Sequence, residues 1–417
     1  MKKRKNYPWI LVALLWAVAL LNYLDRQMLS VMKPAMEIDI AELRSAANFG
    51  YLMAVFLWIY GLMSPVSGII ADRLNRKWLI VYSLFVWSGV TFAIGYATTF
   101  KQLCILRAIM GISEAVYIPA GLSLIADFHA AKSRSLAVGI HMTGFYAGQA
   151  LGGFGAAVAE TFSWQGAFRA FGVIGMAYSV ILILFLNEKD KVGETFTAEG
   201  QSQKPVPELF KGLSVLMSNK AFWAILFYFA VSSLPGWATK NWLPTLFAQN
   251  LHITMVAAGP LSTITLAASS FMGVIMGGLL SDKWAQTNKR GRVFTSAIGL
   301  ALTIPALLLM GFGHSLLCVL GAGVCFGAGF GMFDANNMPI LCQFVSARHR
   351  ATAYGIMNMT GVFLGAFITD ILGKSSDDGN LGTDFAKLAA VILVALAVQL
   401  YFLRPIHDES LLNFQHN

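Results

Sequence analysis

Charged residues are scarce in this sequence, and so are the motifs of common enzymes. Asp, Glu, Lys and Arg make up 12% of the 417 residues, against about 25% in a soluble domain. No HExxH, no GxSxG and no phosphate-binding glycine loop occurs, which argues against a metalloprotease, a serine hydrolase and an ATP-driven pump. We therefore expect a protein that is not an enzyme and that holds no cofactor.

Cysteine is also rare. The four cysteines all fall inside apolar runs and show no paired spacing: Cys104, Cys318, Cys325 and Cys342. Neither a disulfide framework nor a zinc site is indicated by that pattern. We expect no metal site.

Long apolar runs fill most of the chain. A membrane-spanning helix needs about 20 mostly apolar residues. Twelve runs of that kind occur, at 8–32, 47–69, 78–98, 101–125, 135–159, 166–186, 219–248, 253–280, 292–312, 315–340, 350–373 and 382–404. The first is too long for a cleaved signal peptide and lacks a small-residue cleavage site. The sequence therefore predicts an all-α membrane protein of twelve transmembrane helices, surrounded by a lipid bilayer.

The basic residues predict the orientation of these helices. With the N-terminus inside, 21 of the 30 Lys and Arg residues fall in cytoplasmic segments and six fall outside. This excess follows the positive-inside rule, so both termini are expected in the cytoplasm. The net charge of +9 is explained by topology, and no nucleic-acid partner is expected. We predict a multi-pass protein of the inner (cytoplasmic) membrane that works as a monomer.

A hydrophilic stretch divides the chain into two halves of six runs each. We predict a bundle over 1–186, a cytoplasmic linker over 187–218 and a second bundle over 219–417. Pro207 begins either a short amphipathic helix on the inner surface or an unremarkable part of the linker; both interpretations stay open. An internal repeat supports the division, because similar loops follow the second and the eighth runs.

The two loops read 68-GIIADRLNRK-77 and 278-GLLSDKWAQTNKR-290. The first resembles the loop signature of the major facilitator superfamily, with Asn75 where a second glycine is usual. The resemblance covers the whole chain and implies two six-helix bundles that rock around a central site. It also implies a cytoplasmic gate that does not touch the substrate, made of Gly68, Asp72, Arg73, Arg76 and Asp282.

Four charged side chains lie inside the predicted spans. The stretch 22-NYLDRQML-29 places Asp25 and Arg26 in span 1. Burying a charge in a bilayer is costly, and adjacent residues on a helix point about 100° apart. We therefore expect each of the two to find its partner on another helix.

Span 4 supplies the other two charges in 107-RAIMGISEA-115. Arg107 and Glu114 share a face about two turns apart, and Gly111 between them leaves a notch for a helix or a ligand. Two interpretations are open: a structural salt-bridge network that locks spans 1 and 4 together, or a functional site. Four charges at matched depths favour function, since ionisable groups inside a membrane are functional candidates by default.

These residues point to one family within the superfamily. The sequence resembles the anion:cation symporter family in Asp25-Arg26, in RxxxGxxEA at 107–115, in Pro119 and in 242-WLPTLF-247. That family includes bacterial carriers of hexuronates and other sugar acids, and animal carriers of sialic acid, glutamate and phosphate. The spinster-type lysolipid carriers share the patterns in spans 1 and 4, so that resemblance also stays open.

The resemblances imply a secondary transporter that works by alternating access. The main hypothesis is proton-coupled symport of a small organic anion, and the favoured anion is a sugar acid such as a hexuronate. Arg26 and Arg107 would bind the carboxylate, because a planar guanidinium can hold it with two hydrogen bonds. Glu114, with Asp25 second, would carry the proton and release an arginine when protonated. A lysolipid carrier and a facilitator of a neutral sugar are the alternatives, and Na⁺ in place of H⁺ stays open.

Further polar and aromatic residues are expected to line the path. They are Tyr23, Gln149, Trp237, Lys240, Asn358 and Thr360. Lys240 has a second interpretation as a lysine that extends to the membrane surface. Trp237 has one as an interfacial anchor.

Overall fold

The computed structural model describes residues 6–129, 131–188, 216–346 and 349–404. Over these ranges the chain is helical and contains no β-strand, which confirms the predicted all-α class there. The first half contains α1 (Tyr7–Val31), α2 (Lys33–Asp39), η1 (Ala41–Arg44), α3 (Ala46–Arg73), α4 (Arg76–Ile94), α5 (Phe100–Ala115), α6 (Tyr117–Phe128), α7 (Ala131–Gly152), α8 (Gly155–Phe162) and α9 (Trp164–Phe185). The second half contains α11 (Lys220–Leu251), α12 (Met255–Ala285), α13 (Gly291–Phe312), α14 (Leu316–Asp334), α15 (Asn337–Phe344), α16 (Arg350–Asp377) and α17 (Leu381–Phe402).

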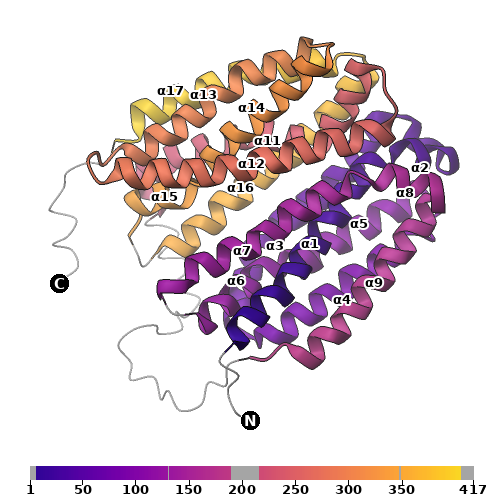
Figure 1. Cartoon of the computed structure of the whole chain (residues 1–417), viewed down its shortest axis with the longest axis horizontal. Helices are drawn as coiled ribbons and strands as arrows, with labels where there is room; N and C mark the ends of the chain where they lie inside the picture. Colours follow the sequence, from indigo (N-terminus) through magenta and orange to yellow (C-terminus); the bar gives the residue numbers. More distant parts are fainter. Residues whose placement is uncertain (1–5, 130, 189–215, 347–348, 405–417) are drawn as a thin grey trace.

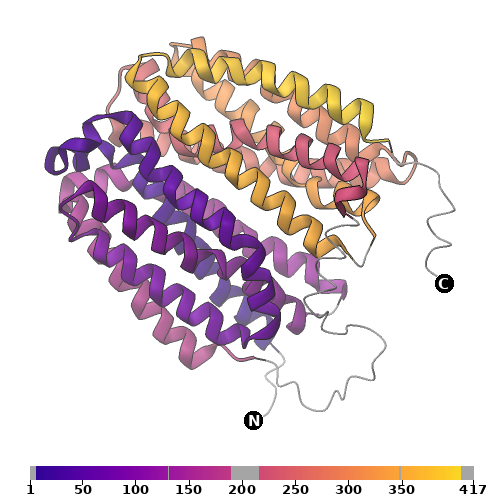
Figure 2. The same cartoon turned by 180° about the vertical axis from the view of Figure 1, so that it is seen from behind.

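Figures 1 and 2 show these helices as two bundles, one of α1–α9 and one of α11–α17. The bundles converge at the side where α1 ends and spread apart towards the side where α1 begins and α17 ends. We name these the far side and the terminal side. The predicted boundaries at 186 and 218 stay predictions, and Pro207 lies outside the described residues.

Eleven described helices or helix pairs are long and apolar enough to cross a membrane. They coincide with eleven of the twelve predicted runs. The exception is the run 135–159, which is divided between α7 and α8. This segment is less apolar because α7 begins with Lys132 and Arg134 and carries His141 and Gln149 further along. The total of twelve spans and the cytoplasmic position of the termini stay predictions.

Close packing of α7 on α1 sets the position of the charged part of α1. Gly148 makes this packing possible, since a Cβ there would lie 2.2 Å from the carbonyl oxygen of Leu20. Small residues let membrane helices approach to backbone contact. Gly152 meets Gln27 and Leu24 in the same way one turn later. Residues 20–28 of α1 are therefore packed directly against the backbone of α7.

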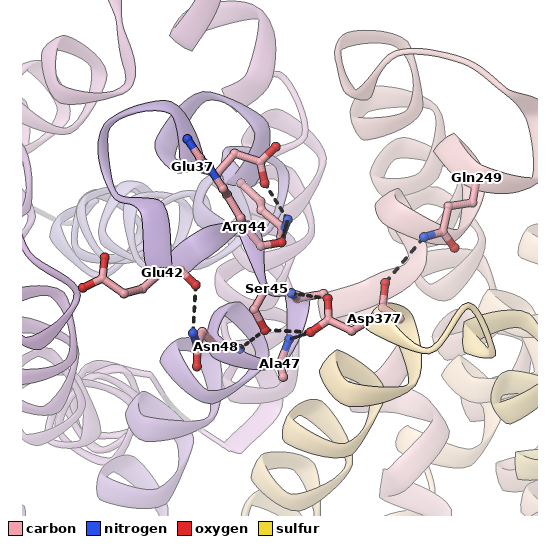
Figure 3. A network of polar contacts seen from close by, with 11 residues as sticks. Glu37, Glu42, Arg44, Ser45, Ala47, Asn48, Gln249 and Asp377 are labelled. Atoms are coloured by element: carbon pink, nitrogen blue, oxygen red, sulfur yellow. Dashed lines mark hydrogen bonds and ion pairs between the residues drawn. The ribbon is translucent and has the colours of Figure 1, made fainter.

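One carboxylate joins the two bundles at the far side. Asp377, at the end of α16, accepts hydrogen bonds from the hydroxyl of Ser45 (2.7 Å) and from the backbone N–H groups of Ala46 (2.7 Å) and Ala47 (2.9 Å), as Figure 3 shows. These donors form the N-terminus of α3, where a helix carries unsatisfied N–H groups and partial positive charge. A negative side chain of one bundle thus caps a helix of the other.

A second contact at this side joins α7 and α12. A Cβ on Gly259 would lie 2.3 Å from the carbonyl oxygen of Gly153. Thr263 donates a hydrogen bond of 3.2 Å to the carbonyl of Ala150. Both pairs of helices therefore meet closely at the far side.

The predicted gate residues lie towards the terminal side. Arg76 forms an ion pair with Asp127 of α6, and Asp282 pairs with Arg292 of α13 at 3.0 Å. Each pair joins helices of a single bundle. Gly68 lies on α3 with open space beside it, and the side chains of Asp72 and Arg73 lie outside the described part of the chain. The gate role of these residues stays a prediction.

Candidate substrate site

A buried ion pair links α1 to α5. Arg26 donates through Nε to Oε2 of Glu114 at 2.7 Å, and Asn22 donates to the same oxygen at 2.8 Å. Glu114 and Asn22 are completely buried. Oε1 of Glu114 and Nη2 of Arg26 are buried and have no hydrogen-bond partner among the described residues. An acid and a base therefore meet with one buried polar atom on each side chain still unpaired.

Aromatic rings hold the Arg26 guanidinium in place. Its carbon lies 4.6 Å from the ring centroid of Phe56, 4.7 Å from that of Tyr60 and 5.3 Å from that of Tyr23. Cation–π contacts of this kind are stronger where water is excluded. The rings orient the planar fork while leaving Nη2 free to bind an acceptor.

Arg107 lies behind the same ring. Its guanidinium carbon is 4.5 Å from the centroid of Phe56, and Nη1 is 3.2 Å from the sulfur of Met110. The side chain is buried, and none of the described residues forms a hydrogen bond with its Nε. The notch predicted at Gly111 is filled by α3, since a Cβ there would lie 2.8 Å from the carbonyl oxygen of Phe56. The notch thus serves the packing of α3 on α5.

Asp25 faces away from its neighbour in sequence. It accepts a hydrogen bond of 3.1 Å from Thr91 of α4 and is buried. Arg26 turns instead to α3 and α5. Each of the two charges finds its contacts on a different helix, in agreement with the 100° step. We call Asp25, Arg26, Arg107 and Glu114 the charged cluster.

A cavity lies between the bundles next to this cluster. Its polar lining comes from both halves and consists of Tyr23, Tyr146, Gln149, Thr239, Lys240 and Asp334, together with Ser270. Tyr23 belongs to both places, because it lines the cavity and packs on Arg26. The cavity therefore has at one wall a tyrosine that packs on Arg26, and a lysine and an acid at the other.

Lys240 lines this cavity instead of extending towards a membrane surface. Its ammonium lies 5.0 Å from the ring centroid of Trp237 and 5.9 Å from that of Tyr23. Trp237 does not line the cavity itself; it packs on Lys240 and on Gly365 of α16. Lys240 is thus part of the cavity wall, and Trp237 packs against Lys240 and α16.

The two predicted residues of α16 lie elsewhere. Asn358 donates to the hydroxyl of Ser64 on α3 at 3.1 Å, a contact between the bundles. Thr360 donates to the carbonyl of Met357 in its own helix at 2.8 Å. Neither is among the described residues that line the cavity. Their role in binding substrate stays a prediction.

Sequence reasoning missed Asn22, Phe56, Tyr60 and Asp334. Phe56 and Tyr60 stand in an apolar run and look like ordinary core residues; only the fold brings them to Arg26. Asn22 could have been found from the sequence, since it precedes Arg26 by four residues and so lies on the same face of the helix. Asp334 could also have been found, because it is an acid inside the apolar run 315–340.

Comparison with known proteins gives a consistent result. The sequence profile described as Major Facilitator Superfamily matches residues 15–369. A hexuronate transporter of Escherichia coli (strain K12) is 26% identical and aligns over 95% of this chain and 94% of its own length. A probable galactarate/D-glucarate transporter of the same strain is 26% identical, with 86% of each chain covered. A chloroplastic ascorbate transporter of Arabidopsis thaliana is 24% identical and covers 94% of this chain and 74% of its own.

A solved structure shows the same fold. It is a bacterial homologue of the human lysosomal transporter Spinster, in an inward-facing and unoccupied conformation. The TM-score is 0.79 and the sequence identity 20%, over 96% of this chain and 98% of that one. At this identity the likeness concerns the fold alone.

Proposed function

The chain belongs to the Major Facilitator Superfamily and is a multi-pass membrane protein, and on that premise we propose that it transports a sugar acid such as a hexuronate together with a proton. The similar proteins named above as carriers of hexuronate and of galactarate or D-glucarate support this substrate class. Each bundle contributes residues to one cavity within a single chain. We therefore propose that the monomer is the functional unit.

The observation that carries the proposal is the buried contact of Arg26 with Glu114 at 2.7 Å. A substrate carboxylate binds best to the same guanidinium, since a planar fork holds a carboxylate with two hydrogen bonds. Glu114 competes for that guanidinium while it is ionised. A proton on Glu114 removes the competing charge and frees Arg26 for the substrate. Proton and substrate then occupy the site together.

The balance of charges around the cavity also supports the coupling of a proton to the substrate. The charged cluster and the cavity wall together hold three bases, Arg26, Arg107 and Lys240. They also hold three acids, Asp25, Glu114 and Asp334. A monoanionic substrate adds one uncompensated negative charge to this neutral set, and such a charge is costly in a low-dielectric site. One proton per anion restores neutrality.

The contacts between the bundles concern the second part of the transport cycle, in which the cavity changes the side of the membrane to which it is open. Asp377 and the Gly153–Gly259 contact join the bundles at the far side, while the bundles spread apart towards the terminal side. We propose that this arrangement is the state open to the terminal side. The far-side contacts break when the cavity opens to the opposite compartment.

A binding screen on the purified protein tests the substrate class. Sugar acids, neutral sugars and lysolipids are added separately, and the midpoint of thermal unfolding is measured at several pH values. We expect sugar acids to stabilise the wild-type protein, because a ligand that binds only the folded state raises its stability, and to leave Arg26→Ala unchanged. Arg107→Ala in parallel shows whether the second arginine takes part. Stabilisation by lysolipids alone, or by neutral sugars independently of Arg26, contradicts the proposal.

A further inference from the structure

One acid of the cavity wall does not carry the proton in the proposed coupling. Asp334 is the last residue of α14, where the helix breaks before α15 begins at Asn337. The residue is more than a third exposed although it lies within the bundle, and it lines the cavity. Asn337 donates to its Oδ1 at 3.3 Å. The carboxylate is thus held at the cavity wall with room to accept further hydrogen bonds.

The cation on the same wall is Lys240, which lines the cavity together with Asp334. Lys240 and Arg26 both lie within 6 Å of the centroid of the Tyr23 ring, so the two cations are at most about 12 Å apart. A six-carbon chain with bonds of about 1.5 Å is roughly 7 Å long. A sugar acid bound at Arg26 by one end therefore spans most of the distance to Lys240, which lines the same cavity as Asp334.

We propose that Asp334 makes the transporter select acids with one carboxylate over acids with two. The proposal rests on the proposed function and sharpens it to monocarboxylate sugar acids of the hexuronate kind. Lys240 by itself would be a second anion site at the far end of the substrate. Asp334 neutralises that cation and adds a like charge against a second carboxylate.

The same carboxylate suits the far end of a monocarboxylate. A sugar hydroxyl has a hydrogen to donate, and an ionised carboxylate only accepts. Asp334 can therefore bind the hydroxyl end of a hexuronate, whereas the terminal carboxylate of an aldarate offers it no donor. Specificity of this kind arises from a repulsive element as much as from an attractive one.

Competition between galacturonate and galactarate tests the proposal, because both have six carbons and differ at C1, which is a hemiacetal hydroxyl in the galacturonate ring and a second carboxylate in galactarate. Each acid competes against labelled galacturonate for uptake into proteoliposomes, and the ratio of the two half-inhibitory concentrations is the readout. Wild type should prefer galacturonate. Asp334→Asn should move the ratio at least about tenfold towards galactarate, the effect of removing one neighbouring charge at an effective dielectric of about 20.

Further variants separate the roles of the two wall residues. Lys240→Gln should move the ratio in the opposite direction, since Asp334 is then uncompensated; this arm stands even if Asp334→Asn does not fold. The double variant, Asp334→Asn with Lys240→Gln, should lose the shift towards galactarate that Asp334→Asn alone produces. Asp370→Asn makes the same chemical change in an acid paired with Lys374 on α16 and should leave the ratio unchanged.

The outcomes distinguish two failures. A ratio that stays within twofold of wild type in both Asp334→Asn and Lys240→Gln overturns the selectivity proposal alone. A wild type that already prefers galactarate does the same. A wild type that takes up neither acid overturns the proposed function, and the selectivity proposal with it.

Discussion

Arg26 and Glu114 lie 88 positions apart in sequence and 2.7 Å apart in space. The contact joins α1 to α5 inside one bundle, next to the cavity between the bundles. Both residues keep a buried polar atom that is unpaired within the described part of the chain, Nη2 in Arg26 and Oε1 in Glu114. Buried polar atoms are usually hydrogen-bonded, so these two atoms are available to bind another group.

The shape of Arg26 matters as well as its charge. Arg26→Lys keeps the positive charge but loses the planar fork and its stacking on Phe56 and Tyr60. We expect the affinity for a sugar acid to fall by at least about tenfold, measured by titration calorimetry at constant pH. Arg169→Lys is the matched control, because Arg169 packs on Tyr96 outside the charged cluster. Equal affinity in Arg26→Lys and wild type would show that charge alone suffices.

The far-side contact predicts a shift between conformations. Asp377→Asn removes the charge that caps α3 and can no longer accept from three donors. Hydrogen bonds to charged groups contribute about 1.5–3 kcal/mol each, so we expect the far side to open in a larger fraction of molecules. Spin labels on the far-side ends of α3 and α16 should show a population at longer distance. Asp378→Asn, one position further along, is the control; if both variants behave as wild type, the cap does not hold the bundles.

Packing of α7 on α1 predicts a loss of stability. Gly148→Val places side-chain atoms where the carbonyl oxygen of Leu20 lies 2.2 Å from a Cβ. Overpacking typically costs about 1–3 kcal/mol, and here it also displaces the segment that carries Arg26. We expect a lower midpoint of thermal unfolding and weaker binding. Gly139→Ala on the same helix meets nothing within 4 Å and should leave both unchanged; equal midpoints in the two variants would refute this account of the packing.

The sequence predicted the helices well because length and apolar composition determine membrane spans almost alone. The run 135–159 departed from this pattern, since α7 carries polar residues. The four charges of the cluster were predicted from their cost in a bilayer. Their pairing was not, because whether Glu114 meets Arg26 or Arg107 depends on how α1, α3 and α5 pack.

Contacts between the bundles were harder still to predict. Asp377 and Ser45 are separated by 332 positions, and no local pattern relates them. Asn358 and Thr360 were expected at the cavity on grounds of polarity, but the rotation of α16 points Asn358 at Ser64 and leaves Thr360 bonded to its own helix. Asp334 reaches the cavity because α14 breaks there, and the sequence does not reveal that break.

The measurement that tests the account most directly compares two modes of transport by Glu114→Gln in vesicles. Glutamine keeps the shape of a protonated glutamate but cannot release a proton. We expect accumulation of sugar acid driven by a pH gradient to be lost, while exchange of labelled for unlabelled sugar acid continues. Asp25→Asn, assayed in parallel, separates the two candidate acids. Accumulation at the wild-type rate in Glu114→Gln would contradict the claim that Glu114 couples the proton to the substrate.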